Sequence, residues 1–255
     1  MEKRELVRDM VIATREQLRQ DGWEVGLDKD MNSSKGRSVS VKIRVHKDLR
    51  KTIDFITTVL GDPNSRNIDF LTIHPRTRQT PSSTPINLEV LELLTNKFGD
   101  QVPILLSGDV FALNALPFSS PFLDSTFTSN GLPQPPPTTT TPLLNLPKLS
   151  GLMSARAQLC NPALYAGYDA CPWEAVETFM NNVARAPLPF KLTLHHVAEM
   201  CAPGMGPNKS ALLSKQERSQ LMQCGDMIEL IDFLDEKREV GMRRMEWEIK
   251  ENGRI

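Results

Sequence analysis

The chain has 255 residues, a formal net charge of −1 and a hydrophobic content of 40%. These values are close to the averages of globular proteins, so we expect most of the chain to fold, as one large domain or two small ones. The near-zero net charge excludes a protein that attracts nucleic acid through an overall basic field, so such binding would need a local patch.

The N-terminal segment and the cysteines predict a soluble protein of the cytoplasm or nucleus. The segment opens with charged residues and has no apolar core of the kind that a signal peptide requires. No run of about 18 apolar residues predicts a membrane span. The cysteines are widely spaced, which predicts reduced thiols and no structural metal site. They are Cys160, Cys171, Cys201 and Cys224.

The first half of the chain alternates between predicted helices and strands. The clearest strand is 38–45, where every second residue is apolar. Residues 24–37 are polar with glycines and predict a loop. The predicted helices are 2–20, 48–60 and 87–98, and the other strands are 68–74, 102–106 and one that begins at Gly151. This order predicts right-handed βαβ units and a parallel sheet.

Two further regions differ in composition from this alternation. The segment 112–149 contains a run rich in Pro, Ser and Thr, which buries too little apolar surface to fold and predicts a disordered insertion. Beyond residue 165 the pattern is helical, and we expect an appended helical domain over 166–255. Its predicted helices are 173–184, 191–200 and 215–238.

Polar or charged side chains gather at the ends of the first two predicted strands. Lys42 and Arg44 share the polar face of a strand, whereas parallel strands are usually apolar on both faces. Two cations on one face suggest an anionic ligand, or else an edge strand with a solvated face. His74, Arg76 and Arg78 follow the second strand, where they suit a phosphate or cofactor; the alternative is a capping histidine with solvated arginines.

Two weaker signals follow the third and fourth strands. Ser107, Gly108 and Asp109 predict a turn whose bare N–H groups suit an anion, although an ordinary turn explains the same residues. Ala155 and Arg156 stand in the same relation to the fourth strand. In an α/β barrel the loops after the last two strands often form a phosphate site, which would unite these two signals.

Three other features are given structural interpretations. Cys171 lies beyond the last strand and predicts a structural thiol. His195 and His196 face different directions on a predicted helix, which suits one metal poorly. The segment GMGPNKS at 204–210 lacks the Gly before Lys and follows a helix, so it is not a phosphate-binding loop.

As an ordered set, the motifs of this chain resemble those of the tRNA-dihydrouridine synthases. The resemblance covers nearly the whole chain, and two of the motifs are most similar to the eukaryotic branch that acts on D-loop uridines 20a and 20b. The motifs are SVKIRV, DFLTIHPRTRQ, PILLSGDVF, GLMSARAQLCNPALYAGY, PWEAVETF and FKLTLHHVAEM.

The resemblance implies an FMN-binding (β/α)8 barrel followed by a helical tRNA-binding domain. Residues 1–165 would then be the C-terminal half of the barrel, with four βα units. In the family, FMN reduced by NADPH passes a hydride to the C5=C6 bond of a uridine that is turned out of the tRNA. An active-site cysteine protonates the other carbon. It lies upstream of the strand lysine, so we expect this chain to lack it.

The resemblance also implies roles for individual residues. Lys42 would contact the isoalloxazine or ribityl part of FMN, and His74 the side near its phosphate. The phosphate would be cradled by the backbone N–H groups of two loops, and two arginines would contact substrate or flavin. The loops are Ser107, Gly108, Asp109 and Ala155, Arg156; the arginines are Arg44 and Arg76. Ser107 and Ala157 depart from the family, which commonly has Asn and Gly there.

Three functions remain open from the sequence. The first is a tRNA-dihydrouridine synthase, with the activity of this chain alone undecided. The second is a non-catalytic half-barrel that binds RNA or another protein, and the open sheet edges of a half-barrel would make it prone to aggregation. The third is a different FMN barrel oxidoreductase, which the helical C-terminal region disfavours.

Overall fold

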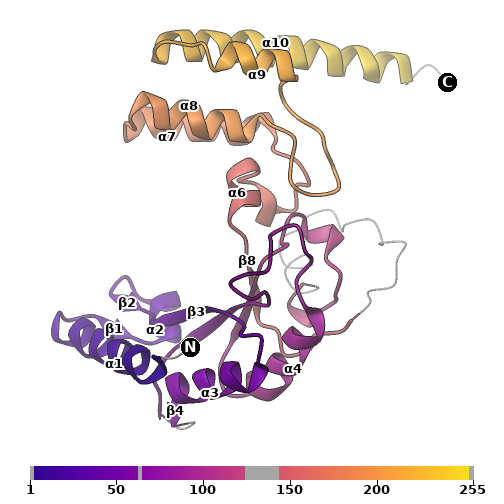
Figure 1. The fold of residues 1–255 in the computed structure, drawn as a ribbon. Helices are drawn as coiled ribbons and strands as arrows, with labels where there is room; N and C mark the ends of the chain where they lie inside the picture. Colours follow the sequence, from indigo (N-terminus) through magenta and orange to yellow (C-terminus); the bar gives the residue numbers. More distant parts are fainter. Residues whose placement is uncertain (1–2, 63–64, 124–143, 253–255) are drawn as a thin grey trace. The chain divides into compact units, whose positions relative to one another are not determined.

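The computed structural model describes residues 3–62, 65–123 and 144–252. By its internal contacts the chain forms two compact units (Figure 1). In the described residues the first unit comprises 3–62, 65–110, 116–123 and 144–154, and the second comprises 111–115 and 155–252. The sequence placed the corresponding boundary after residue 165.

The first unit is built on a four-stranded parallel sheet with the strand order β3-β6-β7-β8. Helix α3 (Leu49–Leu60) connects β3 to β6, and α4 (Leu88–Phe98) connects β6 to β7 (Figure 1). The strands are β3 (Ser40–Arg44), β6 (Phe70–His74), β7 (Ile104–Ser107) and β8 (Gly151–Met153). The predicted α/β organisation with a parallel sheet is therefore confirmed.

The two faces of the sheet differ in character. One face is apolar and buried, with Leu71, Ile73, Ile104 and Leu106 each at most 1% exposed. The other face, which we call the open face, carries Ser40, Lys42 and Arg44 exposed on β3. No other strand in the described part of the chain pairs with the outer edges of β3 and β8. The polar alternation seen in the sequence thus marks the face of β3 that lies opposite the buried apolar face.

A buried ion pair links helix α1 (Arg4–Gln20) to the residue that precedes β6. The Nη1 atom of Arg15 lies 2.6 Å from Oδ2 of Asp69, and the two side chains are 12% and 6% exposed. The same carboxylate oxygen accepts a hydrogen bond of 2.7 Å from the backbone N–H of Val39. This contact joins the helix to the segments that lead into β3 and β6.

The prediction of a loop over 24–37 was wrong. Strands β1 (Glu24–Val25) and β2 (Gly36–Arg37) form a short parallel pair around helix α2 (Leu27–Asn32). The guanidinium of Arg37 stacks 3.7 Å from the centre of the Trp23 ring. These elements are too short to show a hydrophobic period in the sequence, so tertiary contacts determine whether they form. A further short hairpin joins β4 (Gly61–Asp62) to β5 (Ser65–Arg66).

The predicted disorder over 112–149 was wrong at both ends of the segment. Phe118, Leu146 and Leu149 are at most 3% exposed and belong to the core of the first unit. The hydroxyl of Ser120 donates a hydrogen bond of 3.2 Å to the backbone oxygen of Leu149. The short helix η1 (Leu113–Ala115) belongs to the second unit. The central part, 124–143, lies outside the described residues.

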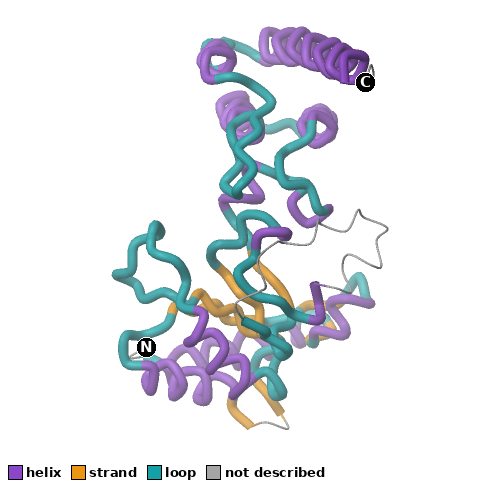
Figure 2. Tube along the Cα trace, turned by 90° about the vertical axis from the view of Figure 1, so that its right-hand side faces the viewer, coloured by secondary structure: helices purple, strands orange, loops and turns teal. Residues whose placement is uncertain are grey.

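The second unit consists of helices and loops in its described part (Figure 2). Its core gathers buried side chains from α7, α8, α9 and α10, among them Val176, Val197, Leu221 and Leu230. The helices are α6 (Arg156–Cys160), η2 (Leu164–Ala166), α7 (Trp173–Arg185), α8 (Phe190–Met200), α9 (Lys215–Leu221) and α10 (Met227–Asn252). None of the described helices has the length and apolar character needed to cross a membrane.

The prediction of one helix over 215–238 was wrong, because the chain breaks between α9 and α10. The side chain of Asp226 accepts hydrogen bonds from the backbone N–H groups of Ile228 and Glu229, which starts a new helix. The carboxylate of Glu229 in turn accepts from the N–H of Gly225 at 2.7 Å. Local capping by these acidic side chains overrides the continuous apolar pattern.

Candidate functional site

The register of the sheet brings the predicted residues of the first unit onto the open face. Arg44 pairs with His74 in the β3–β6 ladder, and Ser107 with Met153 in the β7–β8 ladder. Ile73 pairs with Leu106, so Ser107 continues the row that His74 occupies. Partners in a parallel ladder point to the same side. Arg44, His74 and Ser107 therefore form one row at the carboxyl ends of the strands.

Lys42 lies on the same face of β3, two residues before Arg44. Its side chain reaches across the sheet from β3, and its Nζ atom lies 3.3 Å from Sδ of Met153 on β8. A thioether is a weak acceptor for an ammonium group. Lys42 is exposed and makes no ion pair with any residue that the structure describes. Its cation is therefore available to a stronger acceptor on the open face.

His74 is held as a neutral imidazole. Burial, followed by the charges of Arg44, Arg76 and Lys42, lowers its pKa from 6.5 to about 4. Nη1 of Arg76 lies 3.4 Å from Nε2 of His74. A guanidinium can only donate, so this contact assigns Nε2 as the acceptor and places the ring proton on Nδ1. His74 thus offers one neutral N–H donor to a ligand.

The lowered pKa of His74 predicts a pH-dependent loss of stability. Below pH 6.5 the histidine of the unfolded chain binds a proton, whereas the folded chain resists binding one until about pH 4. The contribution of His74 is therefore fully present above pH 6.5 and is lost as the pH falls towards 4. A His74→Gln variant lacks this term. As the pH falls from 6.5 towards 4, we expect the wild type to lose more unfolding free energy than the variant does, as measured by urea unfolding. A constant difference would contradict the prediction.

The turn after β7 has an unusual backbone. Gly108 has φ 105° and Asp109 has φ 57°, so two consecutive residues lie in the left-handed region. The backbone N–H groups of Gly108, Asp109 and Val110 donate to no residue that the structure describes. Successive free N–H groups in a turn form a concavity that suits an anion. Ser107 is 5% exposed and lies beside this turn.

Gly108 is also where the backbone comes closest to His74. A Cβ atom at this position would lie 2.9 Å from Cδ2 and Nε2 of the histidine ring and 3.1 Å from Cγ2 of Ile86. Only a residue without a side chain fits there. The glycine in the SGD sequence therefore serves both the backbone conformation and the close approach of the histidine ring.

Arg76 is buried, with its side chain 5% exposed, and is occupied by internal partners. Its Nη2 atom lies 2.6 and 2.8 Å from the two carboxylate oxygens of Asp109. Nε donates to the backbone oxygen of Thr84 at 2.6 Å, and Nη2 also donates to that of Ser82. These contacts give Arg76 a positioning role, and its predicted contact with substrate or flavin stays a prediction.

The carboxylate of Asp109 is a feature that the sequence did not reveal. Besides Arg76 it accepts a hydrogen bond of 2.9 Å from the backbone N–H of Ile86. These contacts of the Asp109 carboxylate link the turn after β7 to the loop after β6. The two residues of the ion pair lie 33 positions apart, and no local pattern marks them as partners.

Ala155 and Arg156 belong to the second unit. Ala155 precedes α6, and its backbone oxygen accepts from the N–H groups of Gln158 and Leu159. Both residues are exposed, and Ala157, the next residue, is buried. Their predicted part in a phosphate site stays a prediction that rests on their position directly after β8.

Three of the four cysteines, Cys160, Cys171 and Cys201, are buried. Cys171 and Cys201 lie in the core of the second unit, and burial raises the pKa of each thiol to about 12. Such thiols stay protonated at neutral pH and are poor nucleophiles. No group of side chains in the described part of the chain could hold a metal ion. Those side chains include His195 and His196, whose rings lie 5.6 Å apart.

Comparison with known proteins finds relatives along most of the chain, although no family model matches it. The tRNA-dihydrouridine(20a/20b) synthase [NAD(P)+] of Saccharomyces cerevisiae is 30% identical over 209 residues, which cover 81% of this chain and 47% of the yeast protein. The protein of the same name from Schizosaccharomyces pombe is 32% identical over 196 residues, covering 77% and 48%. A human protein named tRNA-dihydrouridine(20a/20b) synthase [NAD(P)+]-like is 22% identical over 232 residues, covering 91% and 56%. The chain thus spans about half the length of the curated relatives it matches.

Proposed function

Because this chain is homologous to the tRNA-dihydrouridine(20a/20b) synthases, we propose that it takes part in the FMN-dependent reduction of uridine to 5,6-dihydrouridine in the D-loop of tRNA. In this proposal the first unit is the C-terminal half of a (β/α)8 barrel, and the region 166–255 contacts tRNA. NADPH is the reductant, and the protein works in the cytoplasm or nucleus.

The observation that carries the proposal is the set of donors on and beside the open face. The row that contains His74 and Ser107 ends at a turn with three free N–H groups, and Lys42 lies one step away. In an α/β barrel, phosphate sites form at this end of the last strands. The donor set suits FMN, which combines a phosphate with a ring system that gains negative charge on reduction.

We propose the following contacts between residues of this chain and FMN or the substrate. The N–H groups of Gly108, Asp109 and Val110 hold the phosphate, with Ser107 beside them, and Nδ1–H of His74 donates near the phosphate. Lys42 contacts the ring system or the ribityl chain and stabilises negative charge there. Ala155 and Arg156 are proposed as further phosphate contacts, and Arg44 as a substrate contact. When bound, FMN supplies the hydride for the C5=C6 bond.

The proton for the other carbon is proposed to come from outside this sequence. In the family the active-site cysteine precedes the strand lysine, whereas all four cysteines here follow Lys42. Two of them are buried thiols with a pKa of about 12. We therefore assign no catalytic cysteine to this chain. Activity would need the remaining part of the barrel, supplied by the same or another polypeptide.

The proposal predicts that the purified chain binds FMN, which quenches or shifts the flavin fluorescence in a titration. Replacing His74 with alanine and Lys42 with methionine should each weaken FMN at least about tenfold, because each removes a charge-assisted or buried hydrogen bond. Lys35→Met, an exposed lysine outside this face, serves as the control and should leave the affinity unchanged. A chain that does not bind FMN would contradict the proposal.

The same titration separates the alternatives. A non-catalytic half-barrel would bind tRNA without FMN, whereas an FMN oxidoreductase of small molecules would bind FMN without tRNA. The first alternative draws support from the exposed strand edges of β3 and β8 in the described sheet. Measuring both ligands on one preparation therefore discriminates between the three functions.

A further inference from the structure

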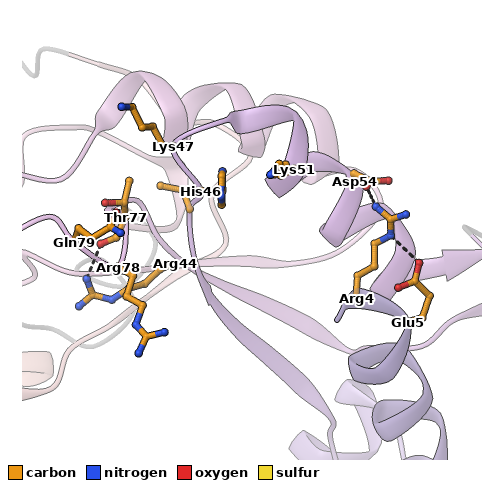
Figure 3. A pocket seen from close by; sticks show the side chains of 11 residues that line it. Arg4, Glu5, Arg44, His46, Lys47, Lys51, Asp54, Thr77, Arg78 and Gln79 are labelled. Carbon is orange, nitrogen blue, oxygen red and sulfur yellow. Dashed lines mark hydrogen bonds and ion pairs between the residues drawn. The ribbon is translucent and has the colours of Figure 1, made fainter. Parts of the chain in front are cut away.

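A basic pocket lies at the carboxyl end of β3, next to the open face. We call it the β3 pocket; its volume is about 840 Å³. Its walls come from the start of α1, from the end of β3 and the loop that follows it, from the first half of α3, and from the loop after β6 (Figure 3). Five basic and two acidic side chains line it. The basic ones are Arg4, Arg44, Lys47, Lys51 and Arg78.

The two acidic side chains lie on one side of the pocket, where both pair with a single arginine. Arg4 forms ion pairs with both Glu5 and Asp54 (Figure 3). Lys47, Lys51 and Arg78 make no ion pair with any residue that the structure describes. The rest of the pocket is therefore a concentration of uncompensated positive charge in a chain whose net charge is −1.

Arg44 connects the pocket to the open face. It lines the β3 pocket and is the register partner of His74. Its Nη1 atom donates a hydrogen bond of 2.9 Å to the backbone oxygen of Thr77, in the loop that also carries Arg78. A nucleotide whose base reaches the open face would therefore place its neighbouring phosphates over this pocket.

We propose that the β3 pocket binds backbone phosphates of the RNA whose uridine is presented to the open face, through Lys47, Lys51 and Arg78. This inference rests on the proposed function, because it takes the RNA to be the substrate of that face. It names a phosphate-binding site that is separate from the FMN phosphate turn after β7.

The make-up of the pocket favours a chain of phosphates over a single phosphate group. Its cations come from separate segments and include two flexible lysines, which act as point charges on repeated phosphates. The N-terminus of α3 is already capped by Asp48, whose carboxylate accepts from the N–H of Arg50 at 3.1 Å. Among the described lining residues Val45 is the one aliphatic side chain, which offers little surface for the adenine ring of a dinucleotide.

The test compares a triple variant of the full chain, Lys47→Gln, Lys51→Gln and Arg78→Gln, with the wild type. The matched control is Lys29→Gln, Lys35→Gln and Arg19→Gln, which removes the same charge from the first unit outside the pocket. Binding of a labelled tRNA transcript is measured at several salt concentrations, and the affinities for FMN and NADPH are measured on the same preparations. The single variant Lys51→Glu provides a second probe should the triple variant not fold, as judged by its thermal midpoint.

We expect the pocket variant to bind the transcript at least about tenfold more weakly, with the slope of log affinity against log salt reduced by about two, since each lost phosphate contact removes about 0.7 to 0.9 from it. The control should keep most of the wild-type slope, and FMN affinity should not change. An unchanged slope in the pocket variant, or transcript binding absent from the wild type, overturns the inference. So does a selective loss of NADPH binding, which would make the dinucleotide the ligand. Failure of FMN binding, in contrast, is the failure of the proposed function.

Discussion

Replacing Gly108 with alanine is expected to destabilise the protein by about 1–3 kcal/mol and to displace His74. The φ of 105° at this position is one that residues with a side chain rarely adopt. The added Cβ would also lie 2.9 Å from two atoms of the His74 ring, which is rigid and cannot yield as the end of a flexible side chain would. Strain in the turn and movement of the ring therefore occur together.

Three measurements check this prediction: urea unfolding, FMN affinity, and the pKa of His74 followed by NMR. We expect weaker FMN binding, and a His74 pKa that returns from about 4 towards its ordinary value of 6.5 as the ring leaves its position. Gly151→Ala is the matched control, because its Cβ would meet only Cγ of Leu105 at an ordinary 3.5 Å. Its stability should change by less than about 1 kcal/mol. Equal behaviour of the two variants would show that the turn after β7 is not constrained.

The strands and the identity of the open face could be predicted from the sequence because both follow from local alternation. Around β3 the apolar residues Val39, Ile43 and Val45 are buried, and Lys42 and Arg44, which alternate with Ile43 and Val45, are exposed. Once the strands are parallel, their carboxyl ends coincide, so Lys42, Arg44 and His74 had to lie at one end of the sheet, and the register then places them on one face. The site was predictable to the extent that strand period and direction determine it.

What the sequence did not reveal depends on contacts between distant loops. The motif HPRTRQ contains two arginines separated by one residue, and nothing local distinguishes the buried Arg76 from Arg78, which lines the β3 pocket. The difference arises because Asp109 reaches Arg76 from another loop, in a left-handed turn. Short elements were missed for the same reason. Helix α2 and the break before α10 are decided by caps and tertiary contacts, which hydrophobic periodicity does not record.

Replacing Asp109 with asparagine is expected to reduce the free energy of unfolding by about 3–5 kcal/mol, the usual cost of removing one partner from a buried ion pair. The side chain of Arg76 is 5% exposed, so its charge would have no water to replace the lost carboxylate. The backbone oxygens of Thr84 and Ser82 still accept from Arg76, which places the expected loss near the lower end of that range.

Asparagine is the appropriate substitution because it tolerates the left-handed backbone at φ 57°. The measured loss then reports the charge and not backbone strain. Asp100→Asn is the control: Asp100 pairs with Lys148 but is 74% exposed, so its loss should cost less than about 1 kcal/mol. Similar losses in the two variants would contradict a buried, structural ion pair at Asp109.

A double variant separates the attraction within this pair from the cost of burying one unpaired charge. When Arg76→Met accompanies Asp109→Asn, no guanidinium is left unpaired in the protein interior. Part of the stability lost in Asp109→Asn should therefore return, which a double-mutant cycle with the two single variants would measure. FMN affinity in the double variant should stay below that of the wild type, because Arg76 also contacts His74 and the loop after β6. Recovery of both together would mean that the pair contributes to stability alone and does not position the cofactor site.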